Sequence, residues 1–502
     1  MISNQPTPPR LKPSSTGIEG LDSILDGGFP SDCFHLIQGD PGSGKTTLAL
    51  QFLFEGVRKG EKVFYITLSE TRQELEKVAL SHDWNLDLIP MVELSSFEDL
   101  VQPEMQLTVF HSGELVLNKV TSRLLEEVAK VRPNRVVFDS LSEYRLMSES
   151  PLRFRRVLLG LKREFEKYQS TVLLLDDKAD ARGFTLHPNV LSLTHGVVEM
   201  EQYAPDYGTA RRRMRVLKMR GLRFHAGYHD YVIEKGGLQI FPRLVAAEHY
   251  ADFKREPVSS GLPALDSLFG GGLDRGTTTL ILGPAGCGKS SLALQYVSKL
   301  AGTGEQGMVF AFDETISLMC HRAEALGINL CDHIASGKIT ARQVDPAELS
   351  PGEFAVRVQK GVEAGARIVV IDSLNGYLNA MPGEKYLFNQ LHELTSCLNQ
   401  QGVITIMVLA QHGLLNALDG PVDLSYLCDM VVNLRYFEAE GQVRQSVAVI
   451  KKRSGHHEKT IREFKLQGGS GIQIGNPLNE FHGVLSGVPL FHGGHEKMMN
   501  SA

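Results

Sequence analysis

The sequence predicts an α/β protein that contains two tandem copies of one domain, each with a mostly parallel central sheet. Two similar glycine-rich stretches indicate the duplication: "GDPGSGKTTL" begins at Gly39 and "GPAGCGKSSL" begins at Gly283. Within each copy, short apolar segments alternate with amphipathic ones, as in "VVFDSL", "SPLRFRRVLLGLKREFEKY" and "STVLLLDD". Such alternation is typical of strand–helix units, which form parallel sheets.

The composition restricts the class of protein. The chain has 502 residues, a length that suits about two to four domains. Hydrophobic residues make up 42% and charged residues 22%, as in globular proteins. The formal charge of −6 does not favour binding to nucleic acid or to an anionic membrane. Since no apolar run approaches the roughly 18 residues of a membrane span, we expect no membrane segment.

The N-terminus and the cysteines indicate a cytoplasmic protein. The polar, proline-rich leader "MISNQPTPPRLKPSSTG" lacks the apolar core of a signal peptide. The six cysteines form no CxxC pair and no zinc-binding spacing, so we expect reduced thiols. Cys287 lies inside the second glycine-rich stretch, where it is either an oxidation-sensitive thiol or a small residue that fits the loop.

A longer self-similarity surrounds the two stretches. "STGIEGLDSILDGGFP" precedes the first, and "SSGLPALDSLFGGGLD" precedes the second. Lys45 matches Lys289 and Glu70 matches Glu314, in each case 244 residues apart. Further on the spacing becomes 233 residues, where "NRVVFDSLS" matches "RIVVIDSLN" and "VLKMRG" matches "VIKKRS". The first copy therefore carries 11 additional residues, which we place in a surface loop or helix.

These matches divide the chain into four segments. We predict a flexible leader at 1–15, a first domain at 16–247, a second domain at 248–489 and a short tail at 490–502. The late extended segments of each copy are shorter, and we predict that they add antiparallel strands to the sheet.

Both glycine-rich stretches have the spacing of a phosphate-binding loop (P-loop), G-x-x-x-x-G-K-[ST]. Glycines let backbone N–H groups converge on phosphate oxygens, and the N-terminus of the following helix adds its positive end. We expect Lys45 and Lys289 to reach the β- and γ-phosphates of ATP, and Thr46 and Ser290 to bind Mg²⁺. The predicted nucleotide-binding residues are Gly39, Asp40, Pro41, Gly42, Ser43, Gly44, Lys45, Thr46 and Thr47 in the first copy, and Gly283, Pro284, Ala285, Gly286, Cys287, Gly288, Lys289, Ser290 and Ser291 in the second.

An aspartate closes a run of apolar residues in each copy. Asp139 ends "RVVFD" and Asp372 ends "IVVID". In a P-loop protein, a carboxylate at the end of such a strand orients Mg²⁺ through its water shell. The alternative is that each aspartate caps the helix that follows, because "DSL" is a good N-cap sequence.

Glu70 and Glu314 follow the strand after the P-loop helix. A carboxylate there can polarise the water or hydroxyl that attacks the γ-phosphate, so we predict a catalytic role for both. The alternative is a capping-box glutamate for the helices that begin in "SETRQELEKV" and "DETISLMCHR".

A basic pair, Lys218 and Arg220, alternates along an extended run, so that both side chains point to one face. Lys451 and Arg453 form the matching pair in the second copy. Because both pairs lie far along the chain from their P-loops, we predict that they reach the nucleotide of a neighbouring subunit as arginine fingers. The surrounding "RRRMRVLKMRGLRFH" is alternatively a nucleic-acid strip, or a solvated edge strand that its charges protect from aggregation.

Taken together, these motifs resemble the KaiC family, the double-domain relatives of RecA-type ATPases. The resemblance runs from about Thr16 to about Pro489 and includes "GDPGSGKTTLALQFL", "VVFDSLS", "LKMRG", "KKRSGHHEKTIREF" and "LNEFHGVLSGVP". It implies two RecA-like P-loop NTPase domains in a double-ring homohexamer, with ATP at the subunit interfaces. It also implies a slow ATPase in the first domain, a serine/threonine autokinase and autophosphatase in the second, a role in circadian or stress-related timing, and KaiB-type and sometimes KaiA-type partners.

The chain departs from the family pattern at three places. The family's pair of adjacent glutamates is Ser69-Glu70 in the first copy and Asp313-Glu314 in the second. The phosphoacceptor pair falls on Ser425 and Tyr426, which keeps one serine. The tail "LFHGGHEKMMNSA" is short, which does not favour a KaiA-type partner.

Two other functions stay open from the sequence. A DNA-dependent ATPase of the recombinase or helicase type would need basic DNA-binding loops, for which only Arg211 to Arg223 is a candidate, and the net charge opposes it. A nucleotide-gated scaffold would bind ATP at both loops with little hydrolysis.

Overall fold

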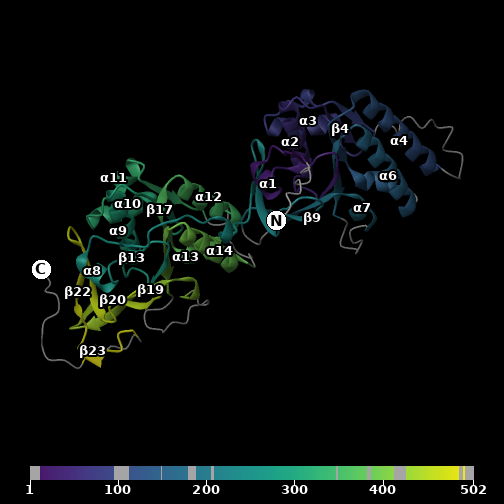
Figure 1. Cartoon of the computed structure of the whole chain (residues 1–502). Helices are drawn as coiled ribbons and strands as arrows, with labels where there is room; N and C mark the ends of the chain where they lie inside the picture. The colour runs from purple at the N-terminus through teal and green to yellow at the C-terminus, as the bar shows by residue number, and fades with distance from the viewer. Residues whose placement is uncertain are drawn as a thin grey trace, which may run out of the picture. The chain divides into compact units, whose positions relative to one another are not determined.

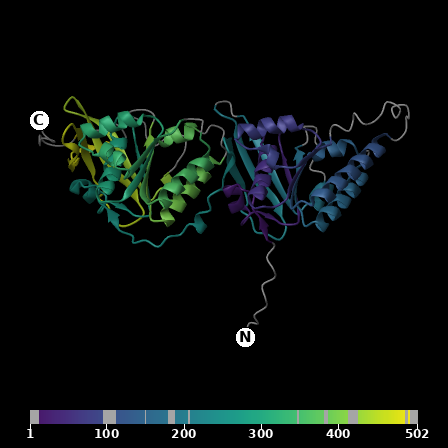
Figure 2. The ribbon, with the colours of Figure 1, turned by 90° about the horizontal axis from the view of Figure 1, so that it is seen from above.

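The computed structural model describes residues 12–94, 112–148, 150–178, 188–204, 208–345, 349–380, 386–411, 425–485 and 490–491. It divides the chain into two compact units: residues 1–204 with 210–243, and residues 244–502 with 205–209. Each unit is built around one nine-stranded sheet. Figure 1 shows the two sheets and their helices, and Figure 2 shows helices on both sides of each sheet.

The sheet of the first unit has the strand order β11-β10-β9-β8-β3-β7-β6-β4-β5. The strands from β8 to β5 are parallel, while β9, β10 and β11 continue the sheet as antiparallel neighbours. The strands are β3 (Phe34–Gly39), β4 (Val63–Thr67), β5 (Met91–Glu93), β6 (Arg135–Asp139), β7 (Thr171–Asp177), β8 (Gly196–Tyr203), β9 (Arg211–Met219), β10 (Tyr228–Glu234) and β11 (Gly237–Phe241). The helices are α1 (Glu19–Ile24), α2 (Lys45–Arg58), α3 (Arg72–Ser81), α4 (Ser112–Val131), α5 (Leu141–Leu146), α6 (Pro151–Lys167) and α7 (Pro188–Leu193).

The second unit repeats this plan, with the order β16-β15-β17-β18-β14-β19-β20-β21-β22. Its strands are parallel from β16 to β19 and antiparallel from β19 to β22. The strands are β14 (Thr278–Gly283), β15 (Gln306–Ala311), β16 (Ile339–Gln343), β17 (Ala366–Asp372), β18 (Ile404–Ala410), β19 (Met430–Ala439), β20 (Gln442–Lys452), β21 (Ile461–Gln467) and β22 (Gly471–Pro477). The helices are α8 (Pro263–Leu268), α9 (Lys289–Gly302), α10 (Ile316–Ala325), α11 (Leu330–Ala335), α12 (Pro351–Glu363), α13 (Leu374–Ala380) and α14 (Leu387–Gln400), and the 3₁₀ turn η5 (Ser425–Leu427) precedes β19.

The matching strand orders confirm the predicted fold class of two tandem α/β domains with mostly parallel sheets. The predicted antiparallel additions are present in both units. Part of the additional length of the first copy lies in α4, which has 20 residues where α12 has 13.

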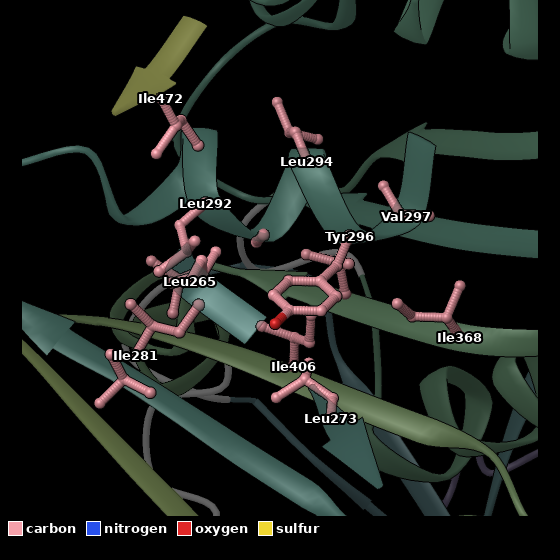
Figure 3. Packing of buried hydrophobic residues seen from close by; sticks show 14 of the residues in the cluster. Leu265, Leu273, Ile281, Leu292, Leu294, Tyr296, Val297, Ile368, Ile406 and Ile472 are labelled. Carbon is pink, nitrogen blue, oxygen red and sulfur yellow. The ribbon is translucent and has the colours of Figure 1, made fainter. Parts of the chain in front are cut away.

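Each sheet buries an apolar layer on both faces, because successive side chains of a strand point to opposite sides. In the first unit, α1, α2 and α3 pack on one face, and α4, α5 and α6 pack on the other. In the second unit, α8 to α11 cover one face and α12 to α14 cover the other. Figure 3 shows the layer between helices α8 to α11 and the sheet of the second unit, with Tyr296 of α9 reaching toward Ile406 of β18. The P-loop strands β3 and β14 therefore lie in the middle of each sheet, between two buried apolar layers.

The described part of the first unit also buries a charged residue, Arg135, which is 1% exposed. Its guanidinium pairs with Glu61, donates to the carbonyl oxygens of Ser15 (2.6 Å) and Phe52 (2.9 Å), and lies 4.6 Å from the centre of the Phe52 ring. It therefore ties the leader of the domain and the P-loop helix α2 to the start of β6.

We predict that Arg135→Ala lowers the free energy of unfolding of the first unit by about 3 kcal/mol, because it leaves two buried carbonyls without their donor and removes the partner of Glu61. Trp84, the single tryptophan, lies in this unit against Phe54. Urea unfolding followed by its fluorescence measures the change. Arg58→Ala is the control, because Arg58 is itself exposed and its partner Glu55 keeps Ser15 and Lys59, so a smaller loss of stability is expected. Equal effects of the two substitutions would contradict the prediction.

Candidate nucleotide-binding sites

Each P-loop joins a central strand to a helix: the first connects β3 to α2 and the second connects β14 to α9. The residue before each helix, Gly44 or Gly288, has a left-handed backbone with φ of 92° or 96°. A Cβ at Gly44 would lie 2.6 Å from Ile233 Cδ1, and one at Gly288 would lie 2.7 Å from a ring carbon of Phe464. Two independent constraints therefore require glycine at these positions: the left-handed backbone and the lack of space for a Cβ atom.

The two P-loop lysines have different partners. Lys45 Nζ donates to the carbonyl oxygens of Gly39 (2.9 Å) and Asp40 (3.1 Å), and it forms an ion pair with Asp177 Oδ1 at 2.9 Å. Lys289 Nζ donates to the carbonyl of Pro284 at 2.6 Å and lies 3.9 Å from Cys287 Sγ. Cys287 is buried, and burial raises the pKa of its thiol, as expected for a small residue that fits the loop.

The predicted metal-binding residues meet in pairs. The side chain of Thr46 lies close enough to Asp139, and that of Ser290 close enough to Asp372, to lower the pKa of each aspartate, so each hydroxyl of a P-loop helix faces the aspartate of a neighbouring strand. Burial has the larger effect and raises the pKa of both aspartates. Asp372 Oδ2 is buried and has no hydrogen-bond partner among the described residues. A hydroxyl and a carboxylate that converge beside a P-loop fit the oxygen donors that Mg²⁺ prefers.

The capping alternative for these aspartates is wrong. The N-cap of α5 is Ser140, and Ser373 Oγ accepts a hydrogen bond from the Gly376 N–H in the first turn of α13. The serine after each aspartate thus takes the capping position, which leaves the carboxylates directed to the P-loop.

Glu70 and Glu314 lie in equivalent turns but in different electrostatic settings. Burial, and then the nearby charge of Asp139, raise the pKa of Glu70 to about 7. Its Oε2 atom is buried without a hydrogen-bond partner in the described part of the chain. Burial also raises the pKa of Glu314, but Arg322 opposes this shift and pairs with Glu314 Oε1 at 2.5 Å. The first copy therefore presents an uncommitted carboxylate, and the second a carboxylate held by an arginine.

The capping-box alternative for these glutamates is also wrong. Thr71 is the N-cap of α3 and forms its capping box with Glu74, while Thr315 caps α10. Glu70 and Glu314 precede the caps by one residue, so neither carboxylate is used in capping.

The basic pairs lie near the amino-terminal ends of the parallel strands, whereas each P-loop follows the carboxyl end of its strand. Lys218 is paired through Val197 with Leu36, near the start of β3, whereas the P-loop follows the other end of that strand. Lys451 is likewise paired through Val431 with Leu280, near the start of β14. The structure thus does not bring either pair together with the P-loop of its own unit.

Both pairs hold the segment that precedes the strand next to the P-loop strand. Lys218 Nζ donates to the carbonyls of Leu191 (2.6 Å) and Thr194 (2.7 Å), and Arg220 donates to that of Ser192 (3.3 Å). In the second unit, Lys451 donates to the carbonyl of Cys428 at 2.9 Å, and Arg453 donates to that of Tyr426 at 2.8 Å. The second pair is therefore in contact with the predicted phosphoacceptor segment.

Ser425 and Tyr426 lie in η5, and Tyr426 is 55% exposed. Arg453 also lines a pocket of about 520 Å³ together with Tyr250, Phe253 and Asp429.

Two arginines of the strip on β9 are neutralised within the sheet, which weakens the nucleic-acid alternative. Arg213 pairs with Glu201 at 2.8 Å and Arg215 pairs with Glu199 at 2.6 Å, both across to β8, and both guanidiniums lie over the ring of Tyr228. Cations that are already neutralised release few counterions when they meet a phosphate backbone.

Three residues of the sites have no counterpart among the sequence predictions. Tyr65 donates to Asp139 Oδ2 at 2.6 Å, Asp177 pairs with Lys45, and Arg322 pairs with Glu314. Of these three residues, only Asp177 has a visible signal in the sequence: it is the second of the two adjacent acids that end "STVLLLDD". Their approach to Lys45 depends on β7 lying beside β3, an order that a sequence pattern does not specify.

Comparison with known proteins gives the family. The family model described as "ATPase: KaiC" matches residues 14–245 and again 258–479. The chain belongs to the KaiC family of ATPases. The circadian clock protein KaiC3 of Synechocystis is 27% identical over 479 residues, covering 95% of this chain and 94% of that protein. The circadian clock oscillator proteins KaiC of Acaryochloris marina and Synechococcus elongatus are 25% and 26% identical, each over 94% of this chain and over 90% and 91% of their own lengths. Membership of the KaiC family accounts for the two P-loops as nucleotide-binding sites.

No helix in the described part of the chain is long and apolar enough to cross a membrane.

Proposed function

We propose that this KaiC-family protein hydrolyses ATP with Mg²⁺ as a double-ring homohexamer, and that its second domain phosphorylates and dephosphorylates Ser425. The observation that carries the proposal is the position of the two basic pairs. Lys218 and Arg220, like Lys451 and Arg453, lie at the sheet end away from the P-loop of their own unit. A ring in which each subunit presents this end to the P-loop of the next would give both pairs a triphosphate to contact.

The residues around each P-loop would supply the groups that hydrolysis needs. Lys45 and Lys289 would contact the β- and γ-phosphates, and the two hydroxyl–aspartate pairs, Thr46 with Asp139 and Ser290 with Asp372, would hold Mg²⁺. Bound Mg²⁺ would neutralise charge on the transferred phosphoryl group. Glu70 and Glu314 would take the proton of the attacking water or hydroxyl. Because Arg322 holds Glu314, we expect slower hydrolysis at the second site than at the first.

The autokinase part of the proposal is supported by the contact between Arg453 and the Tyr426 carbonyl. The residue that would face the neighbour's ATP is thereby linked to the turn that carries Ser425. Tyr426 is exposed, but its larger ring places its hydroxyl farther from the backbone than a serine does.

Two measurements test the proposal. Native mass spectrometry with and without ATP and Mg²⁺ should show a hexamer that requires nucleotide, since a ligand bound between subunits stabilises only the assembled form. Mass spectrometry after incubation with ATP should show phosphate on Ser425. A chain that stays monomeric at saturating ATP and Mg²⁺ would overturn the assembly, and an unmodified Ser425 and Tyr426 would leave only the ATPase.

Because the relatives are named as circadian clock proteins, we further propose a timing or stress-signalling role in the cytoplasm, with a KaiB-type partner. The short tail does not favour a KaiA-type partner. Size-exclusion chromatography of the ATP-loaded protein with a KaiB-type protein tests this part. Separate elution at all nucleotide states would exclude the partner.

A further inference from the structure

Asp177, the last residue of β7, lies in the first site but has no role in the function proposed above. Its backbone is paired with Gly39, the first residue of the P-loop, so the side chain lies beside the loop. Asp177 Oδ1 is 2.9 Å from Lys45 Nζ. A lysine ammonium has three donor hydrogens, and Lys45 already directs Nζ to two carbonyl oxygens and this carboxylate. A γ-phosphate that takes the lysine must therefore displace or share one of these partners.

The neighbouring acid does not compete for the same lysine. Asp176 is held by Arg145 and accepts from Ser142 Oγ at 2.8 Å. Asp177 has a much weaker second partner, the Ser142 hydroxyl at 3.5 Å from Oδ2, and its side chain is 50% exposed. Lys45 is thus the principal cation that compensates the Asp177 carboxylate among the described residues.

The second site lacks this arrangement. The residue paired with Gly283, at the position that Asp177 takes beside Gly39, is Ala410. Among the residues that the structure describes, no carboxylate lies within ion-pair distance of Lys289. The carboxylate that pairs with the P-loop lysine of the first site therefore has no counterpart among the described residues of the second.

We propose that Asp177 is a specificity-determining residue of the first site: it occupies Lys45 in competition with the γ-phosphate and so shifts the preference of this site from ATP toward ADP. This inference rests on the proposed nucleotide binding at the P-loop. ADP leaves the Lys45–Asp177 pair in place because it has no γ-phosphate. ATP loses part of that pair and brings its own negative charge close to the carboxylate.

The test compares Asp177→Asn with the unmodified chain in a Lys289→Ala background, so that the first site dominates the titration. Calorimetry with Mg²⁺ and either ADP or the β,γ-imido analogue of ATP gives the two dissociation constants. We expect Asp177→Asn to raise the preference for the ATP analogue over ADP about fivefold to tenfold, and we expect this gain to shrink as salt is added. An unchanged ratio, with both nucleotides still bound, would overturn the inference.

The reciprocal variant keeps the test decisive if Asp177→Asn does not fold. Ala410→Asp, in a Lys45→Ala background, should lower the ATP-to-ADP preference of the second site by a similar factor. No change there would also contradict the inference. If neither nucleotide binds the folded chain at all, the proposed function fails instead, so the two failures are distinguishable.

Discussion

Arg220→Ala is expected to lower ATP hydrolysis by the first domain about 10³-fold or more, while ATP still binds at the P-loop. The guanidinium of Arg220 donates to the Ser192 carbonyl, away from Lys45, so in the proposed ring its effect would come through the P-loop of another subunit. Phosphate release in the Lys289→Ala background, where the first site dominates, measures the change. Arg223→Ala is the matched control, because Arg223 is an exposed arginine three residues further along the same stretch.

Mixed oligomers distinguish a neighbouring subunit from the same one. Neither Arg220→Ala nor Lys45→Ala chains should hydrolyse ATP at the first site. When the two are mixed, some interfaces combine an intact Lys45 with an intact Arg220 from the adjacent chain, so activity should return. Absence of any recovery, in mixtures shown by mass spectrometry to exchange subunits, would place Arg220 on its own nucleotide or outside the mechanism.

Glu70→Gln is expected to lower hydrolysis at the first site about 100-fold or more, because glutamine cannot accept the proton of the attacking water. The pKa of Glu70 is raised to about 7, chiefly by burial, and only the ionised form is a base. The kcat/KM of the unmodified first site should therefore fall as pH drops through about 7 and reach a plateau above it. The variant should lose this acidic limb together with its activity.

The second domain supplies the control for Glu70. Because Arg322 holds Glu314, Glu314→Gln in the Lys45→Ala background should have a smaller effect on phosphate release than Glu70→Gln has at the first site. If Glu70→Gln leaves hydrolysis almost unchanged and the acidic limb remains, Glu70 is not the base. Negligible hydrolysis by the unmodified chain would instead make the nucleotide-gated scaffold the better account.

The sequence predicted the repeated architecture well because the signals are local. Apolar strand runs, glycine spacing and the two chain offsets are visible in the sequence, and they gave the α/β class, the two units and the antiparallel additions. The approach of Thr46 to Asp139 also followed from a local rule. Asp139 ends a parallel strand, Thr46 begins the helix that follows another, and the carboxyl ends of parallel strands meet at one edge of the sheet.

The electrostatic differences between the sites could not be predicted in this way. The raised pKa of Glu70 depends on burial and on the charge of Asp139, which lies on a different strand. Asp177 reaches Lys45 only because β7 is the neighbour of β3, and Arg322 reaches Glu314 from helix α10, which begins two residues after Glu314. Strand order and helix placement are properties of the whole packed domain, and single motifs do not contain them.

The edge hairpin of the first sheet is mechanically part of the phosphate cradle. Tyr231 on β10 donates to the carbonyl of Ser43 at 2.6 Å, and Ile233 packs where a side chain at Gly44 would be. The Leu238 N–H of β11 donates to Gln51 on α2 at 2.8 Å. Strand β10 is thus coupled to the loop, and the outermost strand β11 is coupled to the helix that follows the loop. A macromolecule that adds to or bends β11 would act on α2 directly and on the loop through β10, with no need for a relay through the core.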